Sequence, residues 1–183
     1  LAMAAAMGNK GQIFAYDSDR HRLAPIYDRL KRNGARNVQV RAPGAGVLDD
    51  LLGKMDRVVI DAPCTGSGTW RRRPDAKWKL TAEQVAARVA EQKAILDEGA
   101  RYVKPGGTLV YITCSILDDE NGAQAASFLA AHPEFEALPV RDRLEALSAG
   151  ASGHVHLPAQ GGVLLTPLTT QTDGFFAFLM SRR

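Results

Sequence analysis

Short apolar segments alternate with longer amphipathic segments along this chain, and that alternation limits the folds open to it. Residues 12–16, 57–60 and 108–113 are short and mostly apolar, as buried strands are. Residues 20–33 and 82–103 instead repeat their apolar positions at the spacing of an α-helix. Strands joined by helices build a mostly parallel sheet with helices on both faces. The sequence therefore predicts an α/β fold.

Residues at the ends of these segments support their boundaries. Thr81 and Gln84 have the spacing of a capping box, which begins a helix. The run at 104–107, Lys-Pro-Gly-Gly, is expected to end that helix. One further strand is predicted at 37–41 and one further helix at 120–131.

The C-terminal part of the chain has a different pattern. Residues 161–166 and 175–180 are predicted strands separated by the polar turn 172–174, and we expect them to add an antiparallel pair to the sheet. Residues 143–162 are rich in Ala, Gly, Ser and His and predict a long loop. Because the length suits one core of ordinary size, residues 1–183 are expected to form a single domain.

The composition indicates a globular protein of the cytoplasm. Hydrophobic residues at 45% and charged residues at 23% argue against a disordered or fibrous chain. Apolar runs stay below the ~18 residues that a membrane span needs. The opening segment lacks the basic residues of a signal peptide and does not start with Met, so we expect a fragment of a longer chain. Cys64 and Cys114 make no disulfide framework, which fits a reducing compartment.

We expect neither a metal site nor an oligomer, and the histidines have no spacing typical of metal ligands. They are His21, His132, His154 and His156.

A basic segment with two flanking tryptophans is the clearest candidate for contact with nucleic acid. It runs from Trp70 to Lys79, and its cationic residues include Arg71, Arg72, Arg73 and Lys77. Cations can bind phosphates, and indole rings can stack on bases. The plainer alternative is a solvated loop.

Four side chains that could bind a ligand or take part in a reaction follow predicted strands. In an open parallel sheet, ligands bind beyond the carboxyl ends of the strands. Asp17 follows the first strand, where a carboxylate commonly binds the ribose of a nucleotide-like cofactor, although Asp19 nearby suits a helix cap. Asp61 and Cys64 follow the strand at 57–60, and Cys114 follows the strand at 108–113.

The two cysteines are expected to face one crevice, because strands joined by a right-handed helical connection are usually neighbours. A lone cysteine is most often a small buried side chain. Two cysteines at equivalent strand ends favour a reactive site, for which a redox pair is the alternative to a catalytic pair.

Three segments of the chain resemble one enzyme family. Residues 61–78 read DAPCTGSGTWRRRPDAKW, residues 113–121 read TCSILDDEN and residues 172–182 read TDGFFAFLMSR. In this order they resemble motifs of the Nop/Sun (RsmB-like, Fmu-type) family of RNA cytosine-5 methyltransferases. The paired PC and TCS motifs are the most specific part of the resemblance.

This resemblance implies a Rossmann-like sheet of the class I methyltransferases, with S-adenosyl-L-methionine as cofactor and RNA as partner. It implies that Cys114 is the nucleophile and that Cys64 assists release of the product. It also implies that Asp17 and Asp61 belong to the cofactor site. Ribosomal RNA is the first expected substrate, and transfer RNA is the alternative.

The chemistry explains why a thiol is needed. Carbon 5 of cytosine is a poor nucleophile until a thiolate adds to carbon 6. We expect cationic groups or the predicted helix at 120–131 to lower the pKa of Cys114.

Two departures from the family pattern leave other hypotheses open. The family's glycine-rich cofactor loop would lie before Leu1, so we expect this chain alone to bind the cofactor poorly. No adenine contact is assigned, because residues 41–50 lack the family's acidic residue at the expected place. The alternatives are an RNA-binding remnant without activity and a DNA methyltransferase that uses Cys64 as nucleophile.

Overall fold

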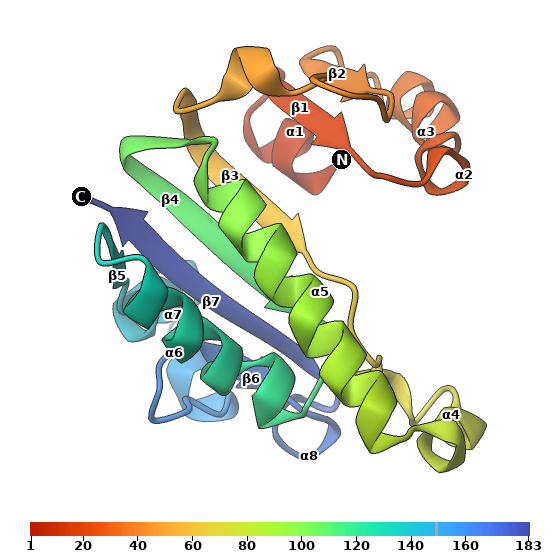
Figure 1. Ribbon diagram of the computed structural model, residues 1–183, viewed down its shortest axis with the longest axis vertical. Coiled ribbons are helices and arrows are strands. Elements are labelled where there is room, and N and C mark those ends of the chain that lie inside the picture. The colour runs from red at the N-terminus through yellow and green to blue at the C-terminus, as the bar shows by residue number, and fades with distance from the viewer. Residues whose placement is uncertain (149) are drawn as a thin grey trace. The chain divides into compact units, whose positions relative to one another are not determined.

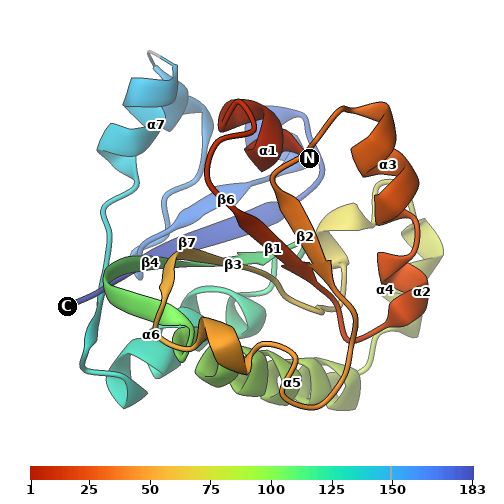
Figure 2. The same ribbon diagram turned by 90° about the horizontal axis from the view of Figure 1, so that it is seen from above.

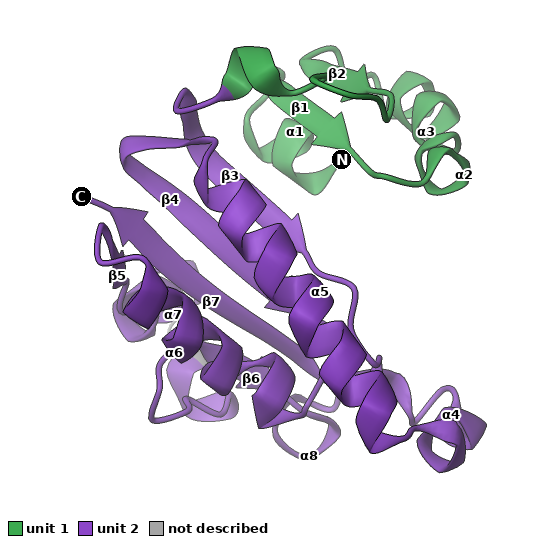
Figure 3. Cartoon of the chain, viewed as in Figure 1, with its two compact units in different colours: residues 1–51 green, residues 52–183 purple. Residues whose placement is uncertain are grey.

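The computed structural model describes residues 1–148 and 150–183, which fold into two compact units. Unit 1 comprises Leu1–Leu51 and unit 2 comprises Leu52–Arg183 (Figure 3). Each unit has a sheet of its own, and the two are described separately.

Unit 1 is a small parallel α/β unit (Figure 1). Its two strands pair in parallel, with Ile13 opposite Val38. The helix predicted at 20–33 is interrupted after Leu23, because Pro25 has no amide hydrogen and disfavours helical geometry in the residue before it. The elements are α1 (Ala2–Ala6), β1 (Ile13–Tyr16), α2 (Arg20–Leu23), α3 (Ile26–Arg32) and β2 (Val38–Arg41).

Unit 2 is built on a five-stranded sheet in the order β3-β4-β7-β5, with β6 also paired to β7. Strands β3 and β4 are parallel, and β7 is antiparallel to each of its neighbours. The predicted parallel arrangement with an antiparallel C-terminal strand is therefore confirmed. The strands are β3 (Met55–Asp61), β4 (Val103–Thr113), β5 (Phe135–Ala137), β6 (Val163–Leu165) and β7 (Phe175–Arg182).

The two longest helices of unit 2 cover one face of this sheet, as the views of Figures 1 and 2 both show. Helix α5 (Ala82–Ala100) begins with the predicted capping box: Thr81 Oγ1 accepts from the amide of Gln84, and Gln84 Oε1 accepts from the amide of Thr81. Helix α6 (Gly122–Ala131) lies beside α5. Their apolar residues close a core with the strands, which includes Leu96, Leu109, Tyr111, Phe176 and Phe178.

Several boundaries differ from the sequence prediction. Strand β4 begins at Val103, so the Lys-Pro-Gly-Gly run lies inside the strand, where the pairing with β3 shifts register between Met55 and Arg57. Strand β5 was not predicted. Helix α7 (Arg141–Leu147) occupies part of the expected loop at 143–162. The short helices α4 (Pro74–Lys79) and α8 (Pro167–Thr170) were not predicted either.

Candidate active site

The two cysteines lie together at the carboxyl ends of β3 and β4. Cys114 directly follows β4, and Cys64 lies three residues beyond Asp61, the last residue of β3. These strands pair in parallel, with Asp61 opposite Ile112, so both loops leave the same edge of the sheet. The Sγ atoms are 3.3 Å apart, which is hydrogen-bond distance for sulfur. The two cysteines thus lie close together, as the order of the predicted strands indicated.

The hydrogen bond makes the two thiols unequal. It lowers the pKa of Cys114 from the ordinary value of 9.0 to about 7, while partial burial and the negative charges of Asp61 and Glu120 oppose that change. The same bond, together with burial, raises the pKa of Cys64. Cys64 therefore keeps its proton and donates it toward a Cys114 thiolate. The pKa of Cys114 is lowered chiefly by a neighbouring thiol, whereas the sequence suggested a cation or a helix end.

Hydrogen bonds join the two cysteine loops directly. The hydroxyls of Ser67 and Ser115 lie 2.9 Å apart, and both residues are buried. The amide of Gly68 donates to the carbonyl of Cys114 at 3.0 Å, and the amide of Ile116 donates to Ser67 Oγ at 2.9 Å. These links restrict relative movement of the loops that carry the thiols.

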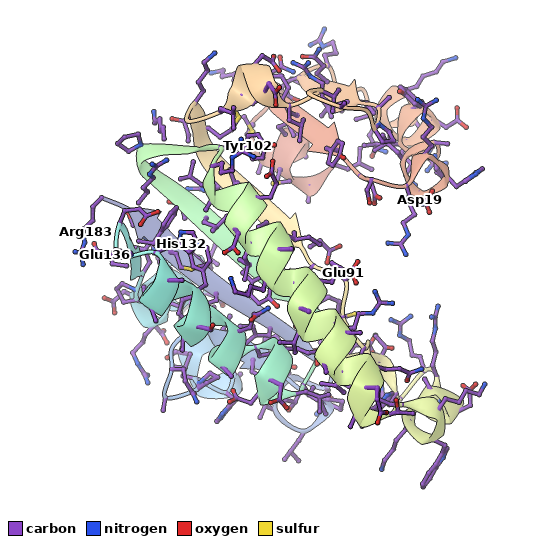
Figure 4. All side chains as sticks on the ribbon, in the orientation of Figure 1. Asp19, Glu91, Tyr102, His132, Glu136 and Arg183 are labelled. Atoms are coloured by element: carbon purple, nitrogen blue, oxygen red, sulfur yellow. The ribbon has the colours of Figure 1, made fainter. Side chains whose placement is uncertain are left out.

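The two carboxylates predicted for the cofactor lie in different units. Asp61 is exposed at the end of β3, close enough to Cys114 to affect its pKa. Asp17 follows β1 in unit 1, and its Oδ1 accepts from the amide of Asp19 at 2.8 Å. Asp19 caps α2 through the amide of His21, as Figure 4 helps to locate. The cap suggested by the sequence is thus assigned to Asp19, and Asp17 remains the candidate ligand.

The predicted RNA-binding arginines are exposed, and two of them have an acidic partner. Arg72 Nε lies 2.5 Å from one oxygen of Asp173, and the Arg71 guanidinium lies 3.5 Å from the other. Asp173 is mostly buried, with a side chain 13% exposed. Arg73 is also exposed and precedes α4. The sequence pattern singled out the cations but missed Asp173, which fixes two of them to the turn before β7.

Lys77 lies near both tryptophans of the basic segment. Its Nζ is 5.8 Å from the centre of the Trp70 ring and 5.4 Å from that of Trp78. Trp78 is 82% exposed, so an aromatic face is accessible beside the cations. This combination suits phosphate contact together with base stacking.

Two glycines allow the basic segment to approach the turn before β7. The amide of Gly174 donates to the carbonyl of Gly68 at 2.8 Å. A Cβ on Gly68 would lie 2.2 Å from the carbonyl oxygen of Gly174, and a Cβ on Gly174 would lie 2.7 Å from Gly68 Cα. Neither contact is sterically possible, so only glycine fits at either position.

The histidines make no metal site in the part of the chain that the structure describes, where no group of three potential ligands comes together. His132 at the end of α6, which is labelled in Figure 4, instead contacts two acidic residues. Its Nε2 lies 2.9 Å from Asp97 and its Nδ1 lies 3.3 Å from Glu134. Among the described residues, no helix is both long and apolar enough to span a membrane.

Known proteins are similar to this chain in sequence and in fold. The family model for 16S rRNA methyltransferase RsmB/F matches residues 2–181. Ribosomal RNA small subunit methyltransferase B of Klebsiella pneumoniae is 38% identical over 177 residues, which are 95% of this chain and 37% of that protein. The chain thus spans little more than a third of that relative.

Solved structures agree with these matches. The crystal structure of PH0851 has a TM-score of 0.86 and 33% identity, covering 98% of this chain and 39% of that one. NSun6 from Pyrococcus horikoshii, solved with SFG, has a TM-score of 0.79 and 26% identity, covering 98% of this chain and 44% of that one. The fold is that of the class I methyltransferases, and the chain belongs to the RsmB/F family of 16S rRNA methyltransferases.

Proposed function

We propose that the full-length protein transfers a methyl group from S-adenosyl-L-methionine to carbon 5 of a cytosine in RNA, with Cys114 as the nucleophile. The observation that carries this proposal is the thiol pair, 3.3 Å apart at two adjacent strand ends, in a chain of this family. Ribosomal RNA is the proposed substrate, as the names of the family and of its bacterial relative indicate. The reaction would take place in the cytoplasm.

In the first step the Cys114 thiolate adds to carbon 6 of the cytosine. A bond forms between Sγ and carbon 6, and the electrons of the carbon 5–carbon 6 double bond become available at carbon 5. A pKa near 7 supplies a useful fraction of thiolate at neutral pH. The cofactor supplies the electrophilic methyl group that carbon 5 then accepts.

Elimination completes the reaction. A base removes the proton from carbon 5, the double bond reforms, and Sγ of Cys114 leaves as a thiolate. Cys64 keeps its proton and lies within hydrogen-bond distance of that sulfur, so it can stabilise the departing thiolate. This supports separate roles for the two thiols: Cys114 attacks, and Cys64 assists its release.

The carboxylates suit parts of the cofactor. Asp17 follows a parallel strand and remains partly exposed although Oδ1 already accepts one bond, so it can accept ribose hydroxyls as well. Asp61 presents an exposed carboxylate beside Cys114, which suits a cationic cofactor held next to the nucleophile. We propose both as cofactor ligands.

The basic segment is proposed to bind the RNA. Arg71, Arg72, Arg73 and Lys77 would contact phosphates, and the exposed Trp78 would stack on a base. Asp173 would keep two of the arginines oriented until phosphates replace it.

Methyl transfer by the full-length protein tests the proposed reaction. RNA from cells with and without the gene is compared by bisulfite sequencing, and the purified protein is given labelled cofactor with either RNA or DNA of the same sequence. We expect a cytosine that resists conversion only when the gene is present, and label in RNA alone. Label in DNA, or an identical bisulfite pattern in both cells, would contradict the proposal.

A further inference from the structure

A buried carboxylate holds the loop that carries Cys64. Glu120 is 0% exposed, and its Oε1 accepts from the amide of Thr65 at 2.8 Å while Oε2 accepts from the Thr65 hydroxyl at 2.6 Å. Gln92 donates both to Glu120 Oε1 at 3.0 Å and to the carbonyl of Pro63 at 2.9 Å. Of the two neighbours of Cys64, Thr65 is therefore bonded to the buried carboxylate directly, and Pro63 is linked to it through Gln92.

The next residue along the chain holds the other loop. Asn121 is 3% exposed, and its Oδ1 accepts from the Thr113 hydroxyl at 2.6 Å. Its Nδ2 donates to the carbonyl of Ser115 at 2.9 Å. Thr113 and Ser115 are the two neighbours of Cys114. The Asn121 side chain therefore bonds to the residues on both sides of the proposed nucleophile.

These two adjacent residues are themselves anchored to the sheet. The hydroxyl of Tyr111 on β4 donates to the carbonyl oxygen of Glu120 at 2.7 Å, and Tyr111 is fully buried. A buried carboxylate costs free energy that apolar packing would avoid, so its retention favours a role beyond core stability. The Glu120 carboxylate accepts hydrogen bonds from Gln92 on α5 and from Thr65, which lies in the loop of Cys64.

We propose that Glu120 and Asn121 are positioning residues that together set the distance between the two thiols. The claim rests on the proposed function, because only a reaction that uses both thiols needs their sulfur atoms held at a fixed distance. Neither residue touches substrate; each acts through the loop it holds. A displacement of about 1 Å would be enough to disrupt such a pair.

Oxidation of the thiol pair measures its geometry without any substrate. Diamide takes up the two thiol hydrogens as the sulfurs of Cys64 and Cys114 join in a disulfide, so the rate depends on how often the sulfurs meet. Glu120→Ala and Asn121→Ala should slow this reaction in the full-length protein by at least about ten-fold. Asn121→Ala leaves the charge of Glu120 in place, so in this variant the pKa of Cys114, followed by alkylation and mass spectrometry, should rise from about 7 toward 9.0.

A conservative variant separates geometry from charge. In Glu120→Gln the amide oxygen can accept the bonds from Thr65 and Gln92, and the amide nitrogen can donate to the Thr65 hydroxyl. We expect it to oxidise at close to the wild-type rate. Thr65→Val removes one bond from the loop side and leaves the buried carboxylate in place, so it should slow oxidation less than Glu120→Ala does.

The matched control is Gln124→Ala on the same helix. Gln124 is 4% exposed and donates to the carbonyl of Val89 at 2.7 Å, with no hydrogen bond in the structure to either cysteine loop. It should lose stability but keep the wild-type oxidation rate and the pKa of Cys114.

Methyl transfer is measured in parallel. Glu120→Ala and Asn121→Ala should lower kcat and leave KM for RNA unchanged. Wild-type oxidation rates in both variants, or equal slowing in Gln124→Ala, would overturn the positioning role. Full methyl transfer by Cys114→Ala would instead overturn the proposed function, and the oxidation rates would still decide the positioning role.

Discussion

At the scale of single residues, the division of labour between Cys64 and Cys114 follows from one hydrogen bond. The bond between the two thiols raises the pKa of Cys64, burial raises it further, and Cys64 therefore keeps its proton. Cys114 is thereby left as the more acidic thiol, with a pKa of about 7. The same bond can stabilise the thiolate before attack and after elimination.

The pH dependence of the first step tests this asymmetry. A lowered pKa means that the thiolate forms as pH rises through about 7, so the single-turnover rate of methyl transfer should rise across that range and then level off. Cys64→Ala removes the hydrogen bond, and its profile should move to higher pH. Rapid-quench measurements between about pH 5 and about pH 9, a range of about two units either side of the expected value, would record both profiles. Coincident profiles would contradict the role given to the bond.

The sequence located the candidate reactive residues because each follows a predicted strand. Asp17, Asp61 and both cysteines could be found in this way, since the carboxyl ends of parallel strands mark ligand sites. Glu120 could not. Its role depends on Thr65, which is distant in the chain, and a buried carboxylate in an acidic run looks like a solvated surface until the fold is known.

At the scale of elements, the basic segment and the turn before β7 act as one assembly. Asp173 pairs with Arg71 and Arg72, and Gly174 contacts Gly68 just upstream of the arginines. The turn 172–174 therefore orients a segment about a hundred residues away in the chain, as the separation of the Arg72–Asp173 pair shows.

Salt dependence tests how this assembly binds RNA. Replacing Arg71, Arg72 and Arg73 with Ala should weaken RNA binding and flatten the plot of log affinity against log salt, by about 0.7 to 0.9 for each phosphate that is no longer bound. A control that removes the same charge elsewhere replaces Arg88, Lys93 and Lys104 with Ala. Fluorescence anisotropy at several salt concentrations would measure both slopes. Equal slopes in the two triple variants would rule out a specific role for the segment.

The close approach of the two glycines makes a stability prediction. Gly68→Ala should lower the free energy of unfolding by about 1–3 kcal/mol, because the new Cβ would force the backbone of Gly174 to move. Gly44→Ala is the control, since its Cβ would meet nothing within 4 Å and its φ is not positive. Urea unfolding of both variants is the measurement. A Gly68→Ala protein as stable as Gly44→Ala would contradict this prediction, because it would mean that the turn at Gly174 moves aside without a cost in stability.

The elements that the sequence predicted are those with long, regular patterns. Helix α5 is predictable because its apolar spacing and its capping box agree. The central part of β4 is predictable from its continuous apolar run. Strand β5 was missed because its three residues are too few to show alternation. Helix α2 ends early because of a proline that apolar spacing alone does not register.

At the scale of the whole molecule, each of the two units carries part of the proposed chemistry. Unit 1 carries Asp17, and unit 2 carries both thiols, Asp61 and the basic segment. The α/β class and the antiparallel C-terminal strand were predictable from the order of the elements. The division at Leu51 was not, because no shift of composition marks it in the sequence.

The central claim, that Cys114 attacks and Cys64 assists release, is tested most directly by trapping the covalent adduct. The full-length protein is incubated with RNA and cofactor, denatured and run on a gel. Cys64→Ala should still attack and transfer the methyl group but stall before elimination, so a shifted band that resists denaturation should accumulate. Cys114→Ala and the double variant should show no such band. A shifted band in Cys114→Ala that is absent from Cys64→Ala would reverse the roles and contradict the account.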